Sequence, residues 1–482
     1  MNNKLGYIEK SKRKKILLLC DDIRMHSGIG TMGKEIVLGS AHHYNWINLG
    51  GAIKHPQAGK MLDISAEVNK EVELEDSNVK ILPYNGYGDP KVIRDLIRME
   101  NPDAILAFTD PRYWTWLFDM EREIRSKIPI FYLNIWDDYP SPLYNKEFYN
   151  SCDVLMAISK QTKNINELVL AEEAKNKIIQ YVPHGINTKY FYPIKEGHKD
   201  YNKLTDFKKA AFRNKEYDFV VFYNSRNIRR KSTADTILAY SQFCDMIGKD
   251  KAKKCAFILH TAPVDNNGTY LKVVREALCD SKYVNVFFST DRLETAQLNL
   301  FYNSVDVTIQ LSSNEGWGLA LTESLVTGTM VIANVTGGMQ DQMRFVNQKG
   351  KWIDFNKDFP SNHRGTYKKC GTWAEPVFPS NISLQGSPQT PYIFDDRCSA
   401  EDAALALKKV YDLGKEEREK RGLEGYKWAT GKEAKFTSKL MVGTVIETLD
   451  KGFDNFIPRE SYEFFTIDKK PKKRILHKTT GY

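Results

Sequence analysis

The segment 311–338 constrains the fold of this chain more than any other stretch of the sequence. It follows 305–311, an apolar and β-branched run that is typical of a buried parallel strand. Gly316 and Gly318 allow a tight turn after that strand, and we expect a short helix over 319–326 before the next strand begins. A turn at the carboxyl end of a parallel strand is where open α/β sheets bind ligands.

Two carboxylates belong to this turn and helix. The unpaired N–H groups and the dipole of the helix favour an anion at the turn, where Glu315 lies, and Glu323 follows on the helix. The helical rise separates them by roughly 10 Å, whereas carboxylates that act together on one glycosidic bond lie about 5–9.5 Å apart. We therefore expect Glu315 and Glu323 to hold hydroxyls at opposite ends of one elongated ligand.

The run from Glu315 to Glu323, Glu-Gly-Trp-Gly-Leu-Ala-Leu-Thr-Glu, resembles the Glu-x7-Glu signature of retaining nucleotide-sugar glycosyltransferases (glycosyltransferase family 4, glycogen-synthase-like). Gly328 and the Gly-Gly pair at 337–338 also match that pattern. The resemblance implies an α/β protein of the GT-B fold, in which two Rossmann-like, doubly wound parallel-sheet domains face a cleft. It also implies that the donor contacts Glu323 and four residues of the turn: Gly316, Trp317, Gly318 and Leu319.

A second motif follows the predicted strand 220–224. Arg226 and Lys231 are five residues apart and resemble the Gly-Arg-x4-Lys loop of the same family, with Ser225 in place of the glycine. A fork-shaped guanidinium together with an ammonium suits a diphosphate leaving group. For the intervening Arg229 and Arg230 we expect a solvated surface role.

Weaker motifs complete the expected donor site. The strand 16–20 opens into a turn with Gly28 and Gly30, which resembles the glycine-rich loop that faces the donor in GT-B enzymes. The turn lacks the third glycine and the acidic residue of a dinucleotide fingerprint. Leu293 lies in a segment that resembles the loop that reads the nucleobase.

Two residues are candidates for contact with the sugar or the acceptor. In the resembled family a histidine often follows the strand that we expect at 130–135, but here Trp136-Asp137-Asp138 occupies that turn, so Asp137 is expected to accept a sugar hydroxyl instead. His184 lies in 182–193, which resembles the interdomain segment of the family. His184 either lines the cleft or has a structural role in the loop, and the sequence favours neither.

Composition limits the remaining possibilities. With 482 residues and 41% hydrophobic content the chain is long enough for two globular domains. No apolar run reaches the 18–20 residues that span a membrane. The seven cysteines are scattered without a C-x-x-C pair, which predicts free thiols, a cytoplasmic location and no zinc site.

The net charge of +9 is uneven, because basic and acidic residues balance over 1–200 and the whole excess lies in 201–482. Such a surface attracts nucleic acid, anionic lipid or an anionic donor, or is simply solvated.

Alternating strand and helix patterns predict two α/β domains, and the resemblance implies the following three segments and their roles. Residues 1–193 form an N-terminal, Rossmann-like acceptor domain. Residues 194–450 form the nucleotide-sugar donor domain, with an insertion over about 345–398. Residues 451–482 are a basic segment that packs back toward the first domain, after a last helix over about 436–448.

The resemblance implies a retaining glycosyltransferase that moves a sugar, from a UDP-sugar by preference, to an acceptor hydroxyl without a metal or another cofactor. Arg226, Lys231 and Glu315 are its expected catalytic residues. The acceptor is a glycan, a lipid, a small molecule or, as an alternative, a hydroxymethylated base of DNA; no required protein partner is evident. A sugar-phosphate epimerase or phosphorylase on the same scaffold and a non-catalytic nucleic-acid-binding protein, favoured by the basic tail, are the other hypotheses.

Overall fold

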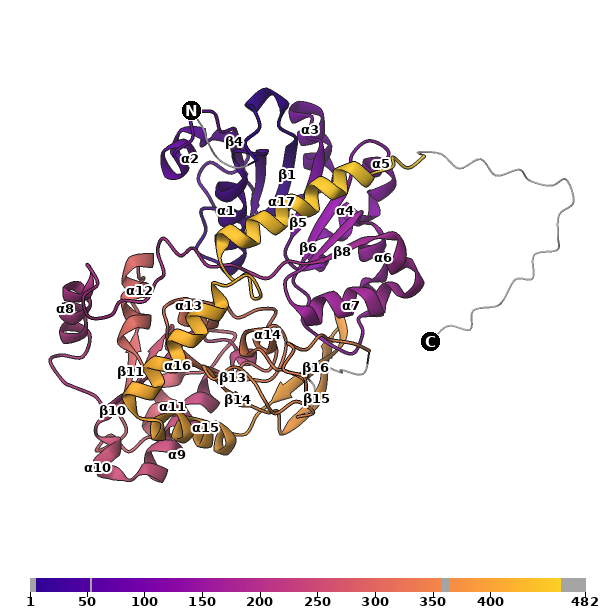
Figure 1. The fold of residues 1–482 in the computed structure, drawn as a ribbon. Helices are drawn as coiled ribbons and strands as arrows, with labels where there is room; N and C mark the ends of the chain where they lie inside the picture. Colours follow the sequence, from indigo (N-terminus) through magenta and orange to yellow (C-terminus); the bar gives the residue numbers. More distant parts are fainter. Residues whose placement is uncertain (1–5, 53, 358–361, 363–364, 461–482) are drawn as a thin grey trace, which may run out of the picture.

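The computed structural model describes residues 6–52, 54–357, 362 and 365–460. The chain forms two α/β domains, one above the other in Figure 1, each built on a parallel or almost parallel sheet. The first domain is drawn in indigo to magenta and the second in pink to orange. The expected GT-B architecture is confirmed.

The N-terminal domain contains an eight-stranded sheet of order β3-β4-β2-β1-β5-β6-β7-β8, in which only the short edge strand β3 is antiparallel. Its central strands are apolar and buried on both faces, as parallel strands covered by helices are. The strands are β1 Lys15–Asp21, β2 Asn45–Gly51, β3 Leu62–Asp63, β4 Val79–Pro83, β5 Ala104–Phe108, β6 Ile130–Asn134, β7 Val154–Ala157 and β8 Ile178–Tyr181. The helices are α1 Gly28–Ser40, α2 Ser65–Val72, α3 Pro90–Glu100, α4 Thr115–Asp119, α5 Glu121–Arg125, α6 Lys146–Asn150 and α7 Lys160–Leu170.

The C-terminal domain contains a six-stranded parallel sheet of order β11-β10-β9-β12-β13-β14. The strands are β9 Phe219–Asn224, β10 Cys255–His260, β11 Val286–Ser289, β12 Val307–Gln310, β13 Met330–Asn334 and β14 Ala374–Val377. The helices are α8 Tyr201–Ala211, α9 Thr233–Ile247, α10 Lys249–Ala252, α11 Leu271–Leu278, α12 Thr295–Ser304, α13 Leu319–Val326, α14 Met339–Met343, α15 Ala400–Asp412 and α16 Gly414–Ala429.

The sequence suggested that the whole segment 345–398 is an insertion, but only part of it is additional to the core of the domain. Its strand β14 pairs in parallel with β13 and completes the core sheet. Sequence patterning missed this strand because it is only four residues long and contains Pro376, and proline is tolerated only at a sheet edge. The additional part is a hairpin of β15 Asn381–Ser387 and β16 Thr390–Arg397, which forms a separate two-stranded sheet.

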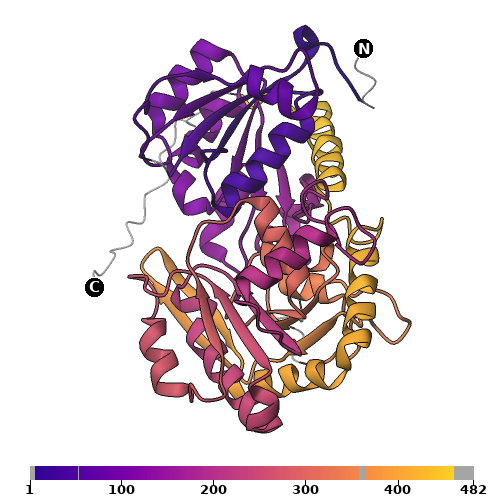
Figure 2. The same cartoon turned by 90° about the vertical axis from the view of Figure 1, so that its left-hand side faces the viewer.

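The last described helix, α17 Ser438–Asn455, returns to the N-terminal domain. It lies along α1 (Figures 1 and 2) and its C-terminal part lies against β6, and a glycine allows the close approach at each contact. A Cβ atom on Gly39 would lie 2.7 Å from Val442 Cγ2, and one on Gly452 would lie 2.7 Å from Phe131 Cε1. The basic tail predicted at 451–482 lies outside the described residues from 461 onward.

In the described part of the chain, none of the helices combines the length and the apolar character that crossing a membrane requires. The seven cysteines are all free.

Candidate active site

A cavity of about 720 Å³ lies between the carboxyl ends of the two sheets. The loops after β1, β5 and β6 line it from the N-terminal domain, and the loops after β9 and β12 line it from the C-terminal domain. Eleven of the residues singled out in the sequence line it together. They are Gly28, Asp137, His184, Arg226, Lys231, Glu315, Gly316, Trp317, Gly318, Leu319 and Glu323.

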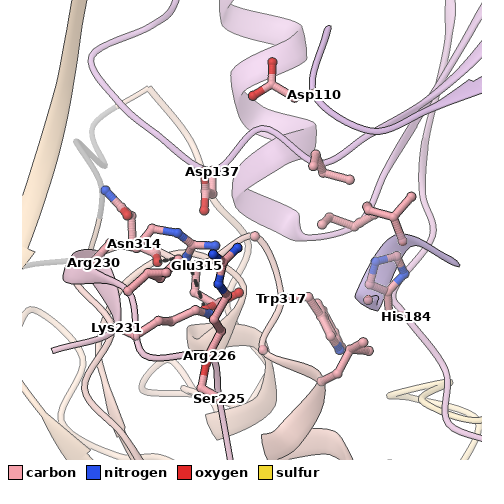
Figure 3. Close-up of a pocket in the computed structure, with 18 of the residues that line it drawn as sticks. Asp110, Asp137, His184, Ser225, Arg226, Arg230, Lys231, Asn314, Glu315 and Trp317 are labelled. Atoms are coloured by element: carbon pink, nitrogen blue, oxygen red, sulfur yellow. Dashed lines mark hydrogen bonds and ion pairs between the residues drawn. The ribbon is translucent and has the colours of Figure 1, made fainter. Parts of the chain in front are cut away.

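Glu315 is at the centre of a charged cluster (Figure 3). Its Oε2 atom is in contact with Lys231 Nζ, accepts a hydrogen bond of 3.0 Å from Gln310 Nε2 and lies 3.4 Å from Arg230 Nη1. Burial alone would raise the pKa of Glu315, but the two cations outweigh it and hold that pKa below its ordinary value. Burial, with the neighbouring Arg230 charge, lowers the pKa of Lys231 to about 8. The cluster therefore contains a buried ion pair between Lys231 and Glu315, with the Arg230 guanidinium beside it.

Arg230 has more than the solvated surface role expected from the sequence, because its side chain lines the cavity although it is 42% exposed. Its guanidinium donates a 2.8 Å hydrogen bond to the Asn314 carbonyl and faces Glu315 inside the cavity. Arg226 also lines the cavity, yet its side chain is 65% exposed and is bound to Asp265 at 2.7 Å. Both arginines thus line the cavity with Lys231, and Arg230 is the one that contacts Glu315.

The glycines of the turn are required by close backbone packing. Gly318 has a φ of +87°, which non-glycine residues rarely adopt. A Cβ on Gly316 would lie 2.9 Å from the Ile135 carbonyl oxygen of the other domain, and one on Gly337 would overlap the Glu315 carbonyl at 2.0 Å. The main chain of the turn therefore approaches both the N-terminal domain and the Gly-Gly segment without side chains between them.

Glu323 occupies a less polar place on α13. It accepts a 2.6 Å hydrogen bond from the hydroxyl of Tyr302, which in turn accepts one of 3.0 Å from Asn224 Nδ2. Burial raises the pKa of Glu323 to about 7, and the Tyr302 hydrogen bond opposes that rise. Glu315 and Glu323 consequently differ in charge state near neutral pH, although both line one cavity.

Asp137 and Asp138 are carboxyl side chains that line the cavity from the N-terminal domain, and Figure 3 shows Asp137 facing the Glu315 cluster. Burial raises the pKa of Asp137, and the charge of Arg230 across the cavity opposes this. Burial and the adjacent Asp137 raise the pKa of Asp138 well above its usual range. Asp138 Oδ1 is buried without a hydrogen-bond partner, so a polar ligand at this end of the cavity would satisfy it.

His184 lies between the two domains with its ring edge-on to Phe108 and Trp317, at centroid distances of 5.9 and 6.2 Å. Burial lowers its pKa to about 3, so the ring is neutral at physiological pH. Its Nδ1 atom is buried without a hydrogen-bond partner. Of the two roles left open by the sequence, the structure favours a cavity-lining neutral imidazole.

Gly30 and Leu293 do not line the cavity. Gly30 lies in the first turn of α1, where its N–H donates to Ser27 Oγ and a Cβ would lie 2.8 Å from the Met25 carbonyl. Leu293 packs against the large apolar cluster that both domains share. These two residues therefore have supporting roles, whereas Gly28 of the same turn as Gly30 does line the cavity.

Further residues line the cavity; two lie in the turn 109–112, which follows a predicted strand and was expected to be able to reach a cleft, and two lie in a segment for which the sequence predicted no site. Asp110 and Arg112 follow β5 and pair with each other at 2.5 Å. Thr390 and Ile393 come from the hairpin. For Asp110 the position after a predicted strand was a usable signal, whereas for the hairpin residues no local pattern indicates the cleft. The described ranges hold no group of three or more His, Cys, Asp or Glu side chains that could bind a metal ion.

Two parallel-sheet domains with a polar cavity between their carboxyl ends define the GT-B class. Solved structures share this fold across almost the whole chain. A glycosyltransferase from Rickettsia africae ESF-5 has a TM-score of 0.61 and 15% identity, and covers 92% of this chain and 100% of its own. Anabaena Alr3699/HepE in complex with UDP and glucose has a TM-score of 0.59 and 13% identity, covering 91% and 100%.

Comparison of sequences adds a family match within the second domain and one similar relative. Residues 206–358 match the family model for glycosyl transferases group 1. The alpha-monoglucosyldiacylglycerol synthase of Acholeplasma laidlawii is 28% identical over 178 residues, which are 37% of this chain and 40% of that relative. The matched segment thus spans less than half of the relative's length.

Proposed function

We propose that this protein is a glycosyltransferase that moves a sugar from a nucleoside-diphosphate sugar to an acceptor hydroxyl. The observation that carries the proposal is the convergence of Lys231 and Arg230 on Glu315 in a cavity that Glu323 also lines. The match of residues 206–358 to group 1 glycosyl transferases supports the same activity. A UDP-sugar is the favoured donor, in line with the UDP complex of the Anabaena protein of the same fold.

Each part of the donor has a candidate partner. Glu323 accepts hydrogen bonds from ribose hydroxyls, and Arg226, Lys231 and the main-chain N–H groups at the start of α13 face the diphosphate. Glu315 holds hydroxyls of the sugar, and Gly28 allows the opposite loop to approach. Cations aimed at the diphosphate lower the barrier because negative charge grows there as the bond to the sugar breaks.

The transfer is proposed to retain the anomeric configuration and to need neither a metal nor another cofactor. The bond from the anomeric carbon to the diphosphate oxygen breaks, a bond from that carbon to the acceptor oxygen forms on the same face, and the acceptor proton passes to the departing diphosphate. Asp137 and His184 contact the sugar or the acceptor from the N-terminal domain. Lys231 and Arg230 supply the positive charge that stabilises the leaving group.

The acceptor is not fixed by these contacts. The name of the Acholeplasma relative points to a glycosylated diacylglycerol, so a lipid acceptor is tested beside glycans, small molecules and hydroxymethylated DNA. Activity on DNA would weaken steeply with salt, and activity on a lipid would require vesicles.

A donor screen tests the proposal. UDP-, GDP-, ADP- and CMP-sugars are incubated with the protein, and release of free nucleotide is followed. We expect slow turnover of one UDP-sugar, and a loss of roughly 10²–10³-fold in the Lys231→Ala variant, as for removal of one charge-stabilising donor. Arg229→Ala is the matched control, since Arg229 is an exposed arginine of the same loop outside the cavity lining; it should stay within about twofold of wild type. No turnover of any donor, with no thermal shift by any nucleotide, would contradict the proposal.

A further inference from the structure

The β15–β16 hairpin belongs to the C-terminal domain in sequence but contacts both domains. At its base it is fastened to the loop that leads into Glu315. The main-chain N–H of Asp396 donates to the Ser313 carbonyl at 3.0 Å, and Asn314 Nδ2 donates to Asp395 Oδ1 at 3.0 Å. Thr336 and Asn334 also donate to Asp396, each at 2.7 Å. The hairpin is therefore held rigidly against the Glu315 turn.

The same hairpin is bound to the segment that follows Asp137 and Asp138. The main-chain N–H of Phe394 donates to the Tyr139 carbonyl at 2.6 Å. The hydroxyl of Tyr392 donates to the Ser141 carbonyl at 3.1 Å, and its ring packs edge-on against Tyr144 with centroids 5.0 Å apart. Ile393 and Phe394 pack against the apolar cluster of the N-terminal domain. The hairpin thus connects the two loops that carry the acidic residues of the cavity.

Two hairpin side chains face the cavity itself. Thr390 is almost fully buried, Ile393 is half-buried, and both line the same space as Asp137, Asp138 and Glu315. Leu384, on the partner strand, is 62% exposed and does not line the cavity. The side chains of the hairpin that face the cavity can therefore be changed by mutation without changing those on its exposed surface.

We propose that the β15–β16 hairpin is a specificity element of this site: Ile393 and Thr390 close the cavity beside Asp137 and Glu315, so that an acceptor hydroxyl rather than water meets the activated sugar. This role rests on the proposed transferase function. An apolar wall at this place keeps out water, which competes with the acceptor for the sugar. In hydrolysis the bond from the anomeric carbon to the diphosphate oxygen breaks, a bond from that carbon to the oxygen of water forms, and a water proton passes to the diphosphate.

The test measures hydrolysis of UDP-glucose, or of whichever donor the wild-type protein turns over, without acceptor. Ile393→Ala should raise the hydrolysis rate by roughly threefold or more, because truncation opens the wall to water. UDP affinity, measured by calorimetry, should stay within about twofold, since Ile393 is not one of the nucleotide contacts proposed above. Leu384→Ala, an apolar truncation on the same hairpin, should leave both quantities unchanged. Tyr392→Phe, which removes the hydrogen bond to Ser141, should raise hydrolysis in the same direction.

Three results would overturn the inference. An unchanged hydrolysis rate in folded Ile393→Ala would show that the hairpin does not exclude water. A parallel loss of UDP affinity would place the hairpin in the donor site instead. An equal rise in hydrolysis in Leu384→Ala would indicate that any truncation destabilises the hairpin, and not that Ile393 excludes water. If the alanine variant does not fold, Ile393→Val makes the smaller truncation. Turnover by wild type is the separate test of the proposed function, because its absence contradicts the transferase and not the hairpin contacts.

Discussion

Lys231 is an ammonium group that is buried against a carboxylate and beside a guanidinium. Burial is the largest influence and lowers its pKa to about 8, within reach of ordinary assay conditions. A lysine is charged below its pKa, so the free protein loses this cation as the pH rises through about 8. If Lys231 faces the diphosphate, that loss removes stabilisation of the leaving group.

We therefore predict that kcat/KM for donor turnover falls by about tenfold per pH unit above pH 8, because kcat/KM reports the ionisation of the free enzyme. In Lys231→Arg the fall should move to higher pH, since a guanidinium stays charged. The measurement is a kcat/KM profile from pH 6 to 10 for both proteins. An identical alkaline limb in the two profiles would assign the fall to another group.

The sequence identified Glu315, Glu323 and Lys231 because each belongs to a short motif whose spacing follows from a strand, a turn and a helix. Arg230 was misjudged for a physical reason. Neighbouring residues of a loop carry the same charge and differ only in direction, and direction depends on the Asn314 carbonyl, 84 residues away in the chain. Local pattern thus located the loop and two of the cations that line the cavity, Arg226 and Lys231, but not the third, Arg230.

At the scale of elements, the contact between α1 and α17 depends on the absence of a side chain at Gly39. Alanine in a helix interior is ordinarily about 1 kcal/mol better than glycine. Here the added Cβ would lie 2.7 Å from Val442 Cγ2, and overpacking of this kind costs about 1–3 kcal/mol. The two effects oppose each other. The sign of the change in the free energy of unfolding on Gly39→Ala therefore shows whether α17 packs closely on α1.

We predict that Gly39→Ala lowers the free energy of unfolding in wild type but is neutral or stabilising in a Val442→Ala background, where the obstructing methyl groups are gone. Gly443→Ala is the matched control on α17, because nothing lies within 4 Å of a Cβ built there. It should be neutral or stabilising in both backgrounds. Urea unfolding of the four combinations gives the coupling, and purely additive effects would argue against the packing of α17 on α1.

The elements themselves were largely predictable, and their partners were not. Alternating apolar strands and capped helices predicted both parallel sheets. The hairpin had a local signature too, with a Gly-Ser-Pro turn at 386–388 between two runs of alternating side chains. Its docking on Tyr139 and Ser141 depends on contacts about 250 residues apart in the chain, which no single-sequence pattern encodes.

At the scale of the whole molecule, contacts at several separate places hold the domains together besides the linker. They include α17 on α1, the hairpin on the segment after Asp138, and the 2.9 Å hydrogen bond from the N–H of Lys160, at the start of α7, to Asp341 Oδ2 on α14. His26 and Arg292 also meet across the cleft. Because these contacts connect the two domains, we expect that unfolding of one domain destabilises the other.

We therefore predict one cooperative thermal transition in scanning calorimetry rather than one for each domain. UDP at 100 times its dissociation constant should stabilise the whole protein by about 2.7 kcal/mol, as expected for a ligand that binds only the folded state. Two transitions, of which UDP shifts only one, would mean that the domains unfold independently.

The return of α17 to the first domain also has a consequence for synthesis. The N-terminal domain is discontinuous in sequence, because its strands end at Tyr181 while the helix that covers α1 begins at Ser438. On the ribosome, about 240 residues of the second domain must emerge in between, which takes roughly 12–50 s at 5–20 residues per second. During that interval the nascent first domain exposes the apolar side of α1 that α17 covers in the folded protein, and this side is covered only after α17 has emerged.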